Sequence, residues 1–439
     1  MARRPGHYRL WEHHPEPPKK AERIVIAKVH APAAATRSAS ASMSTGARAA
    51  RDAGVAPDSA LARMMDAGYI TSMRNVFDEG QDDGTRSLAM TVIAGGGREL
   101  TPAEPPRLVE LKVKRGESPA RVAAHVAGMT DVEYAFVPPI RRLFGRRRRA
   151  VKADPLASRQ WAHGAIRLGH ARARAGFNNA ANITVAVIDS GIDPKHPDLK
   201  KVIVEYQNFL GGSNKDFVGH GTHVSGIIAA TNGNGLGISG VCGSRILAMK
   251  ALPRDGEEFD PPAYYRALRY TIGRAEVLNL SLGGDRDPAE NDIIADVIRA
   301  GVVVIAAMGN EYEEGNPTEY PAAIADVCAV GATDDVDKRA SFSNTGRHLD
   351  LVAPGVAILS TTPTFRYDDG EREFDSWDGT SMATPHVAAA AALILAKWPG
   401  LTPAQVIRKL TSSADRVAGA KKGSRAYGAG RLNVQRALR

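Results

Sequence analysis

Residues 183–191 read ITVAVIDSG, and the architecture can be worked out from this run. Residues 183–188 are apolar and largely β-branched, which is typical of a strand that is buried on both faces. Asp189 ends the run, and Gly191 follows in a turn. In open parallel sheets, functional side chains gather beyond the carboxyl ends of the strands. The run therefore predicts a central parallel strand with Asp189 at the edge where a site would form.

Further buried strands are predicted at residues 246–250, 277–280 and 302–306. Helical stretches alternate with these strands, so the sheet should be mainly parallel with helices on both of its faces. We therefore predict an α/β fold for residues 159–439. The Ala-rich run at 384–397 should form a buried helix, because alanine permits close packing against a sheet.

Two other segments place reactive side chains where the chain should change from loop to helix. Residues 219–223 read GHGTH and precede an apolar stretch, which puts His220 at the mouth of a helix. Residues 379–381 read GTS and put Ser381 at the start of the Ala-rich helix, beside free backbone N–H groups and the positive end of the helix dipole. An acid, an imidazole and a hydroxyl are the parts that let a serine attack an acyl carbon.

The order Asp, His, Ser, with DSGID, HGTHVSG and GTSMATPHVA around the three residues, resembles the subtilisin-like serine proteases, or subtilases. The segments VLNLSLGG, VVVIAAMGNE and YGAGRLNVQRAL are also similar to the family. The resemblance runs from about residue 161 to residue 438. It implies a subtilisin-like fold and a serine endopeptidase that acts on peptides and proteins and needs no cofactor for catalysis.

The resemblance also implies a role for each matching residue. Ser381 would be the nucleophile, His220 the general base and later the acid, and Asp189 the carboxylate that orients His220. Asn310 would donate its side-chain amide to the oxyanion. The substrate-binding residues would be Ser281, Leu282, Gly283 and Glu311.

Each of these residues also has an ordinary structural interpretation. An Asp at a strand end before Gly, or an Asn after Gly, is commonly a turn residue. The family pattern places the base at His220, so His223 and His386 are interpreted as packed structural histidines.

Residues 23–140 show a different pattern. Strand-like and helical stretches follow one another as β-α-β-β-α-β when the strand-like stretch at 88–94 is left out, which is the order of ferredoxin-like domains. Subtilase propeptides resemble this small α+β domain. We therefore interpret residues 23–140 as a propeptide that would inhibit the chain's own active site. The alternative is an unrelated α+β accessory domain. The polar, Pro-rich residues 1–22 are predicted to be disordered.

Residues 141–158 are predicted to be a basic linker, with four consecutive arginines from Arg146 to Arg149. Such a run is most often a solvated linker. The alternative is a processing site. Glu311, Glu313 and Glu314 would lie at the rim of the substrate pocket, which suggests a preference for a basic residue before the cleaved bond and a cut within or after the arginine run. Attraction at a wet rim contributes only about 1 kcal/mol.

A structural calcium ion is a further implication of the resemblance. Asp198 and Asn234 match residues of a family calcium site, and Gln160 would add another oxygen. Carboxylate and amide oxygens suit this hard cation. However, the glycine-rich turn at 231–237 is one residue longer than the family pattern.

Composition excludes several classes of protein. The 439 residues carry a net charge of +9, and a basic chain can bind nucleic acid. The arginines cluster in the linker and the N-terminal third, and no zinc-finger, RNA-binding or helix-turn-helix spacing is present, so no nucleic-acid partner is expected. A pseudoprotease that binds peptides without cutting them is a second alternative, which the presence of all three catalytic residue types disfavours. The sequence contains no apolar run of about 18 residues, so no membrane span is expected.

Three smaller expectations complete the sequence analysis. Cys242 and Cys328 lie in apolar contexts and are predicted to be buried free thiols, with a disulfide as the alternative. The first 20 residues have no apolar core of a secretion signal, which favours a cytoplasmic over a secreted location. The polar, charged stretch at 362–377 is interpreted as a hairpin, a partner site or a substrate lip.

Overall fold

The structure is a computed structural model. It describes residues 24–29, 60–75, 92–94, 98–100, 108–130, 132–138, 141–143, 146–147, 156–174, 177–254, 256, 258–365, 373–421 and 423–439. The chain divides into two compact units, the first made of residues 1–80 and 107–138, the second of residues 81–106 and 139–439. The predicted disordered tail at 1–22 lies outside the described residues.

The first unit is a four-stranded antiparallel sheet with the strand order β2-β5-β1-β6. Its elements follow the order β-α-β-β-α-β that the sequence predicts: β1 (Ile24–Val29), α2 (Ala60–Asp66), β2 (Ile70–Asn75), β5 (Leu108–Val113), α3 (Pro119–Ala127) and β6 (Val132–Phe136). Apolar side chains of both helices and of the sheet form one core. Helix α3 begins as expected, with the Ser118 hydroxyl accepting from the Arg121 N–H and Pro119 in the first turn.

The predicted N-terminal domain is interrupted. Strands β3 (Val92–Ala94) and β4 (Arg98–Leu100) pair with each other and join none of the first unit's strands. Residues 81–106 are accordingly grouped with the second unit. The strand-like stretch at 88–94, which the β-α-β-β-α-β order leaves out, corresponds to β3.

The second unit contains a seven-stranded parallel sheet with the order β10-β11-β9-β12-β14-β15-β16. The sheet strands are β9 (Thr184–Asp189), β10 (Ile203–Asn208), β11 (Arg245–Lys250), β12 (Val277–Leu280), β14 (Val303–Ala307), β15 (Cys328–Thr333) and β16 (Leu351–Pro354). All six residues of β9 are buried, as its β-branched sequence predicts. The predicted parallel α/β architecture is confirmed.

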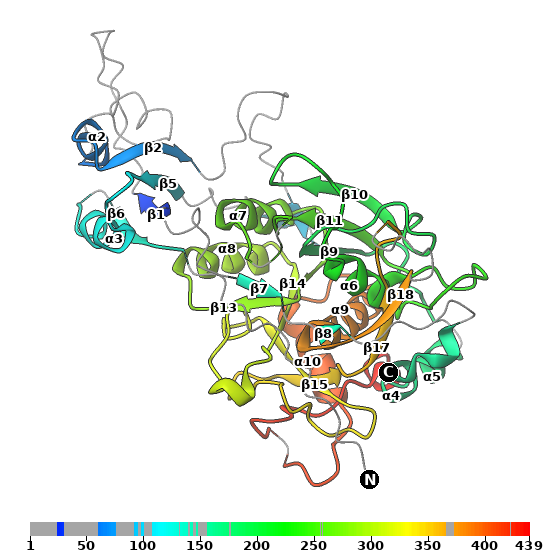
Figure 1. Cartoon of the computed structure of the whole chain (residues 1–439). Coiled ribbons are helices and arrows are strands. Elements are labelled where there is room, and N and C mark those ends of the chain that lie inside the picture. The colour runs from blue at the N-terminus through cyan, green and yellow to red at the C-terminus, as the bar shows by residue number, and fades with distance from the viewer. Residues whose placement is uncertain are drawn as a thin grey trace, which may run out of the picture. The chain divides into compact units, whose positions relative to one another are not determined.

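Helices cover both faces of this sheet. Helix α6 (His220–Ala229) packs against α9 (Thr380–Lys397), and α7 (Pro261–Tyr270) packs against α8 (Pro288–Arg299). Figure 1 draws the α7–α8 pair on one side of the strands and the α6–α9 pair on the other. Helix α9 is buried along nearly its whole length, from Thr380 to Ala396, and its alanines let it lie close to β12, β14 and β15. Its start at Thr380 places Ser381 in the first turn.

Smaller elements surround this framework. Strand β13 (Leu282–Gly284) pairs with β7 (Arg141–Leu143), and β17 (Ile358–Thr361), β18 (Phe374–Asp378) and β8 (Arg146–Arg147) form a three-stranded antiparallel sheet. The described residues of the second unit also form helices α4 (Trp161–Ala165), α5 (Leu168–Arg172), α10 (Pro403–Ser413) and α11 (Val434–Ala437), with 3-10 turns η2 (Leu156–Arg159) and η3 (Tyr312–Glu314). Because β17 and β18 pair, the ends of the polar stretch at 362–377 meet as a hairpin. Its residues 366–372 lie outside the described residues.

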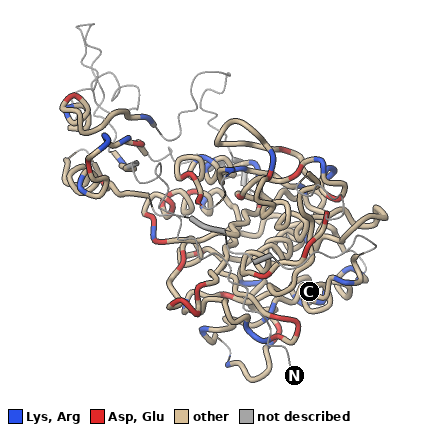
Figure 2. Tube along the Cα trace, viewed as in Figure 1, with Lys and Arg blue, Asp and Glu red and all other residues tan. Residues whose placement is uncertain are grey.

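The state of the two cysteines, the membrane-span expectation and the distribution of charge can be compared with the described residues. Cys242 and Cys328 are both buried and free, and burial raises the pKa of each thiol. Within the described ranges, no helix combines the length and apolarity of a membrane span. Figure 2 shows Lys and Arg interspersed with Asp and Glu along the described part of the chain.

The packing of α6 against β17 makes a prediction about stability. A Cβ added to Gly226 of α6 would overlap the hydroxyl oxygens of Thr361 and Ser360 and lie only 3.0 Å from the Thr361 backbone N. We expect Gly226→Ala to lower the free energy of unfolding by about 1–3 kcal/mol, because this core cannot expand without strain. Urea denaturation in a Ser381→Ala background measures the change.

Gly169 provides the matched control. It also lies within a helix, α5, but a Cβ added there would have no neighbour within 4 Å. Gly169→Ala should therefore leave stability unchanged or raise it by about 0.5–1 kcal/mol, through the better helix propensity of alanine. Equal effects of the two substitutions would contradict the packing argument.

Candidate active site

Asp189 and His220 form a direct, buried hydrogen bond. Strand β9 carries Asp189 at its carboxyl end, and α6 begins with His220. The Nδ1 atom of His220 lies 2.9 Å from Oδ2 and 3.0 Å from Oδ1 of Asp189. Because a carboxylate accepts, Nδ1 carries the proton and the opposite ring atom, Nε2, is left to act as an acceptor.

A glycine makes this hydrogen bond sterically feasible. A Cβ on Gly221, the residue after His220, would overlap the Gly191 carbonyl oxygen and lie 2.9 Å from the Asp189 Cβ. Only a residue without a side chain lets the first turn of α6 approach the end of β9 this closely. The glycine in the sequence HGTH is therefore required by the close contact between α6 and the end of β9.

A second carboxylate supports Asp189, and the sequence analysis did not identify it. Asp216 is buried and accepts hydrogen bonds from the Ser190 hydroxyl (2.7 Å), the Gly219 N–H (2.7 Å) and the Thr222 N–H (3.0 Å). The Ser190 N–H donates to Asp189 Oδ1 at 2.7 Å. Burial raises the pKa of Asp216, and these hydrogen bonds oppose that rise. An Asp three residues before GHGTH is the only sequence signal that pointed to it.

Ser381 is held by two hydrogen bonds with Ser281. The Ser381 Oγ donates to the Ser281 carbonyl at 3.0 Å, and the Ser281 hydroxyl donates to the Ser381 carbonyl at 2.9 Å. The second bond has a clear cause. Pro385 follows Ser381 by four residues in α9 and has no N–H, so the usual helical donor to the Ser381 carbonyl is missing. The Ser281 hydroxyl supplies it.

Asn310 follows the loop after β14 and faces the start of α9. Its side-chain oxygen accepts from both the backbone N–H and the hydroxyl of Thr380, each at 2.9 Å. The carboxamide is therefore oriented by the residue directly before Ser381. The Asn310 N–H in turn donates to the Glu311 carboxylate at 2.7 Å, and burial raises the pKa of Glu311.

One ring nitrogen of His220 is hydrogen-bonded to Asp189 and the other is not hydrogen-bonded within the described part of the chain. Nε2 is buried and has no hydrogen-bond partner among the described residues, while Nδ1 is held by Asp189. Trp377 lies beside it, with the two ring centroids 6.3 Å apart. Helices α6 and α9, which begin at His220 and Thr380, pack against each other. The helix that begins at His220 thus packs against the helix that carries Ser381, but no hydrogen bond joins the His220 imidazole to the Ser381 hydroxyl.

The other two histidines of these helices are structural, as the sequence analysis interprets them. His223 stacks on Trp377 at 4.6 Å between centroids and donates from Nε2 to the Asp375 carbonyl. The Nδ1 of His386 donates to the Met382 carbonyl at 2.8 Å. Burial lowers the pKa of His223 to about 3 and that of His386 to about 4.

Of the predicted substrate-binding residues, Ser281 bonds Ser381 directly. Leu282 and Gly283 belong to β13, whose backbone pairs with the extended segment β7, and Ser281 directly precedes that strand. Glu311 contacts Asn310, whereas Glu313 and Glu314 are exposed on η3.

The predicted calcium ligands lie near one another, but their oxygens are already engaged. Asp198 accepts from the Asn234 amide at 2.6 Å and from the Ile238 N–H at 3.0 Å. The Asn234 oxygen accepts from the Leu236 N–H, and the Gln160 oxygen from the Ser239 N–H. Among the described residues, no group of three or more acidic, His or Cys side chains is placed so that it could hold a metal ion. A calcium ion bound here would have to share these oxygens with the protein donors.

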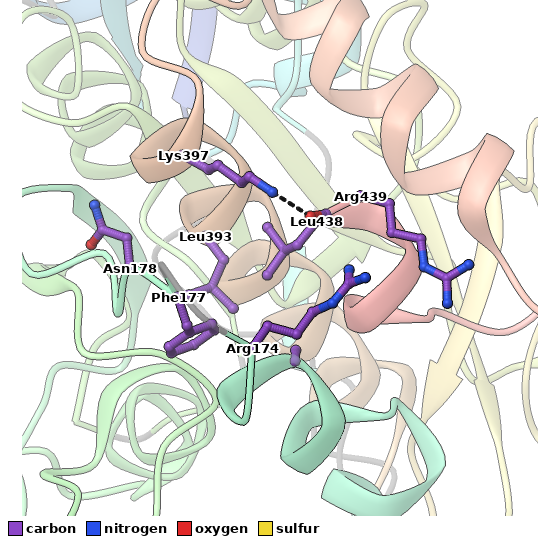
Figure 3. A pocket seen from close by; sticks show the side chains of 8 residues that line it. Arg174, Phe177, Asn178, Leu393, Lys397, Leu438 and Arg439 are labelled. Atoms are coloured by element: carbon purple, nitrogen blue, oxygen red, sulfur yellow. Dashed lines mark hydrogen bonds between the residues drawn. The ribbon is translucent and has the colours of Figure 1, made fainter.

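A hollow of about 400 Å³ lies elsewhere on the second unit. Leu393, Lys397 and Leu438 line it together with Arg174 and Phe177, and Figure 3 shows Lys397 reaching toward the Leu438 carbonyl. Lys397 follows Ser381 by 16 residues on α9, about 24 Å along the helix. This hollow therefore lies at the opposite end of α9 from Ser381.

Comparison with known proteins gives consistent matches. The model of the subtilase family matches residues 180–430. The chain is 41% identical over 271 residues to a subtilisin from Bacillus pumilus, a match that covers 58% of this chain and 91% of that protein. Subtilisin E from Bacillus subtilis (strain 168) is 41% identical over 271 residues, covering 58% of this chain and 66% of the relative. The major intracellular serine protease of the same organism is 40% identical over 225 residues, covering 48% of this chain and 68% of the relative.

The buried histidines predict a pH dependence of stability. His386 has a pKa of about 4 in the folded chain, below its ordinary value of 6.5. Between these values the unfolded chain binds more protons than the folded one, so the free energy of unfolding falls as the pH falls. One such histidine contributes a slope of about 1.4 kcal/mol per pH unit. We expect His386→Gln, in a Ser381→Ala background, to remove that part of the slope.

Urea denaturation of both proteins between pH 7 and pH 4.5 measures this difference. Comparing the two slopes cancels other titrating groups, such as Asp350, whose pKa burial raises to about 6. Parallel slopes would mean that His386 takes up its proton in the folded chain, contrary to its buried position.

Proposed function

Since the chain belongs to the subtilase family and is a serine-type endopeptidase, we propose that it cleaves peptide bonds through an acyl-enzyme on Ser381. The observation that carries this assignment is the buried Asp189–His220 hydrogen bond, which leaves Nε2 of His220 open as an acceptor. Subtilases need no metal or cofactor for catalysis, and none takes part in the proposed reaction.

In the proposed mechanism, His220 takes the Ser381 hydroxyl proton as the oxygen attacks the substrate carbonyl carbon. Asp189 holds the imidazole in the required tautomer and stabilises the imidazolium that forms. Rotation of the Ser381 hydroxyl from the Ser281 carbonyl toward Nε2 would begin the step. The imidazolium then protonates the leaving amine, and water hydrolyses the ester with His220 again as the base.

The negative charge that develops on the substrate's carbonyl oxygen must be stabilised by hydrogen-bond donors. We assign this role to the side-chain NH₂ of Asn310 and the backbone N–H of Ser381. Thr380 already donates two hydrogen bonds to the side-chain oxygen of Asn310. The side-chain nitrogen of Asn310 is therefore the atom that can donate to a substrate. Preorganised donors of this kind cost no reorientation during the reaction.

Asp216 and Ser190 are proposed as positioning residues. They act through Asp189, because the Ser190 N–H bonds Asp189 and the Ser190 hydroxyl bonds Asp216. Asp216 also accepts from the Gly219 and Thr222 N–H groups at the start of α6. One carboxylate thus links the loop before His220 to the residue after Asp189.

We further propose that the chain is made as a self-processing zymogen whose first unit inhibits the second. Two features support the proposal: the ferredoxin-like order of elements in the first unit and the pairing of linker strand β7 with β13, next to Ser381. Substrates would add to β13 in the same manner, with main-chain hydrogen bonds giving affinity and neighbouring pockets giving selectivity.

Two substitutions test the catalytic assignments. Ser381→Ala should abolish both peptide hydrolysis and labelling by a fluorophosphonate probe, because the nucleophile is gone. Asn310→Ala should keep probe labelling detectable but lower kcat by about 100- to 1,000-fold with KM little changed, a range taken from loss of the equivalent donor in a subtilisin. Hydrolysis that survives Ser381→Ala would overturn the mechanism, and a peptide-binding chain that no probe labels would favour the pseudoprotease alternative.

A calcium ion at Asp198, Asn234 and Gln160 stays a prediction of the family resemblance. Because protein donors already satisfy the oxygens of these residues, we expect the thermal unfolding midpoint of Ser381→Ala to be the same in excess calcium and in a chelator. A calcium-dependent rise that Asp198→Asn removes would show that the ligands rearrange to bind the ion.

A further inference from the structure

A buried carboxylate that the proposed mechanism does not use lies beside Asn310. The side chain of Glu319 is only 8% exposed, and no sequence motif pointed to it. A Cβ added to Gly309, the residue before Asn310, would lie 2.7 Å from the Cγ of Glu319. The Glu319 side chain therefore packs against the turn that carries Asn310.

The Glu311 carboxylate converges on the same point. Its Oε2 would lie 2.9 Å from the same added Cβ on Gly309, and it accepts from the Asn310 N–H at 2.7 Å. Gly309 has a φ of +101° and no side chain, so acidic side chains take the space that a Cβ would need. Glu311 and Glu319, which we call the acidic pair, thus lie together next to Asn310.

The backbone at Glu319 is fixed against β13. Tyr320, the next residue, exchanges two backbone hydrogen bonds with Gly284, the last residue of β13, at 2.9 and 3.0 Å. Strand β13 begins directly after Ser281, which bonds the proposed nucleophile. It also contacts β14, the strand that leads to Asn310 (Figure 1). The acidic pair is therefore positioned by the strand that we propose binds substrates and by the strand that carries the proposed oxyanion donor.

A buried amide adds a further acceptor beside the acidic pair. The Nδ2 atom of Asn344 donates to Oε2 of Glu311 at 3.4 Å and to the Pro317 carbonyl at 3.2 Å. The Oδ1 atom of the same carboxamide is buried and has no hydrogen-bond partner among the described residues. A buried acceptor without a donor lowers stability. A ligand group with a positive charge and several N–H donors would satisfy this oxygen and the acidic pair together.

Burial distinguishes the acidic pair from the neighbouring carboxylates Glu313 and Glu314, which are exposed on η3. Exposed charges are screened by water and salt, so they discriminate weakly between substrates. Burial also raises the pKa of Glu311. A buried carboxylate gains more from a nearby cation than an exposed one does, because less water competes for its charge.

We infer that Glu319, together with Glu311, selects substrates with arginine before the cleaved bond; the inference rests on the proposed endopeptidase function. The carbonyl of that substrate residue is the one that Asn310 would stabilise, so its side chain begins beside the acidic pair. A guanidinium is a planar fork of N–H donors that matches carboxylates, whereas lysine offers one compact charge. The substrate class is an extended peptide with arginine, and less strongly lysine, before the cut.

Three tripeptide aminomethylcoumarin substrates test this selection in the full wild-type chain. They differ only before the cleaved bond, which follows arginine, citrulline or leucine, and citrulline has nearly the shape of arginine without its charge. We expect kcat/KM for arginine to exceed that for citrulline at least about 30-fold, the low end for loss of one partner of a buried, hydrogen-bonded charge pair. Equal values for the two substrates would overturn the inference, and this comparison needs no variant.

Two substitutions identify the carboxylate that selects. Glu319→Gln should lower the arginine-to-citrulline ratio at least about tenfold, because glutamine keeps the shape of glutamate and removes its charge. Glu313→Gln, the matched control at an exposed carboxylate, should keep the wild-type ratio. A ratio that falls in Glu313→Gln and is unchanged in Glu319→Gln would assign selection to the exposed rim and refute the inference. Because each ratio compares two substrates of one protein, a smaller folded fraction of a variant does not alter it.

The leucine substrate and a fluorophosphonate probe separate failure of this inference from failure of the proposed function. A chain that reacts with the probe and cuts the leucine and citrulline substrates as fast as the arginine substrate retains the function, while the acidic pair loses its role. A chain that neither reacts with the probe nor cuts any of the three substrates loses both. Preferential cleavage after arginine that Glu319→Gln removes supports both.

Discussion

The closeness of the first turn of α6 to the carboxyl end of β9 is the constraint from which the rest of the site follows. Gly221 has no space for a side chain against Gly191 and Asp189, and that contact lets His220 Nδ1 reach the Asp189 carboxylate at 2.9 Å. Asp216 holds the same junction from the other side through the Gly219 and Thr222 N–H groups. The imidazole is therefore oriented by packing and backbone contacts as well as by its acid partner.

The second half of the site depends on how helix α9 begins. Pro385 removes the N–H that would bond the Ser381 carbonyl, and the Ser281 hydroxyl replaces it. This exchange ties Ser381, the proposed nucleophile, to the residue before β13, the strand that also pairs with linker strand β7. One residue, Ser281, thus contacts the proposed nucleophile and directly precedes the strand that we propose binds substrates.

Much of this could be predicted from local sequence. The β-branched run before Asp189 predicts the buried strand β9, and the alanine-rich run after Ser381 predicts a buried helix, because both patterns reflect burial on all sides. Asp216 was missed because an Asp before a glycine-rich loop looks like any turn residue; its partners, Ser190 and Thr222, meet it only in the folded chain. The pairing of Arg146 and Arg147 with β18 was also missed, since charge alone does not say which strand a basic run will join.

Sequence was sufficient for the parallel α/β architecture and the β-α-β-β-α-β order of the first unit, and it named the candidate acid, base and hydroxyl, because periodicity and short motifs act over a few neighbouring residues. Folding in three dimensions was needed to show that the candidate calcium oxygens accept hydrogen bonds from protein donors and that β7 and β8 of the linker pair with β13 and β18. Hydrogen-bond partners and strand registers join residues far apart in the chain, and no local pattern encodes which of them will meet.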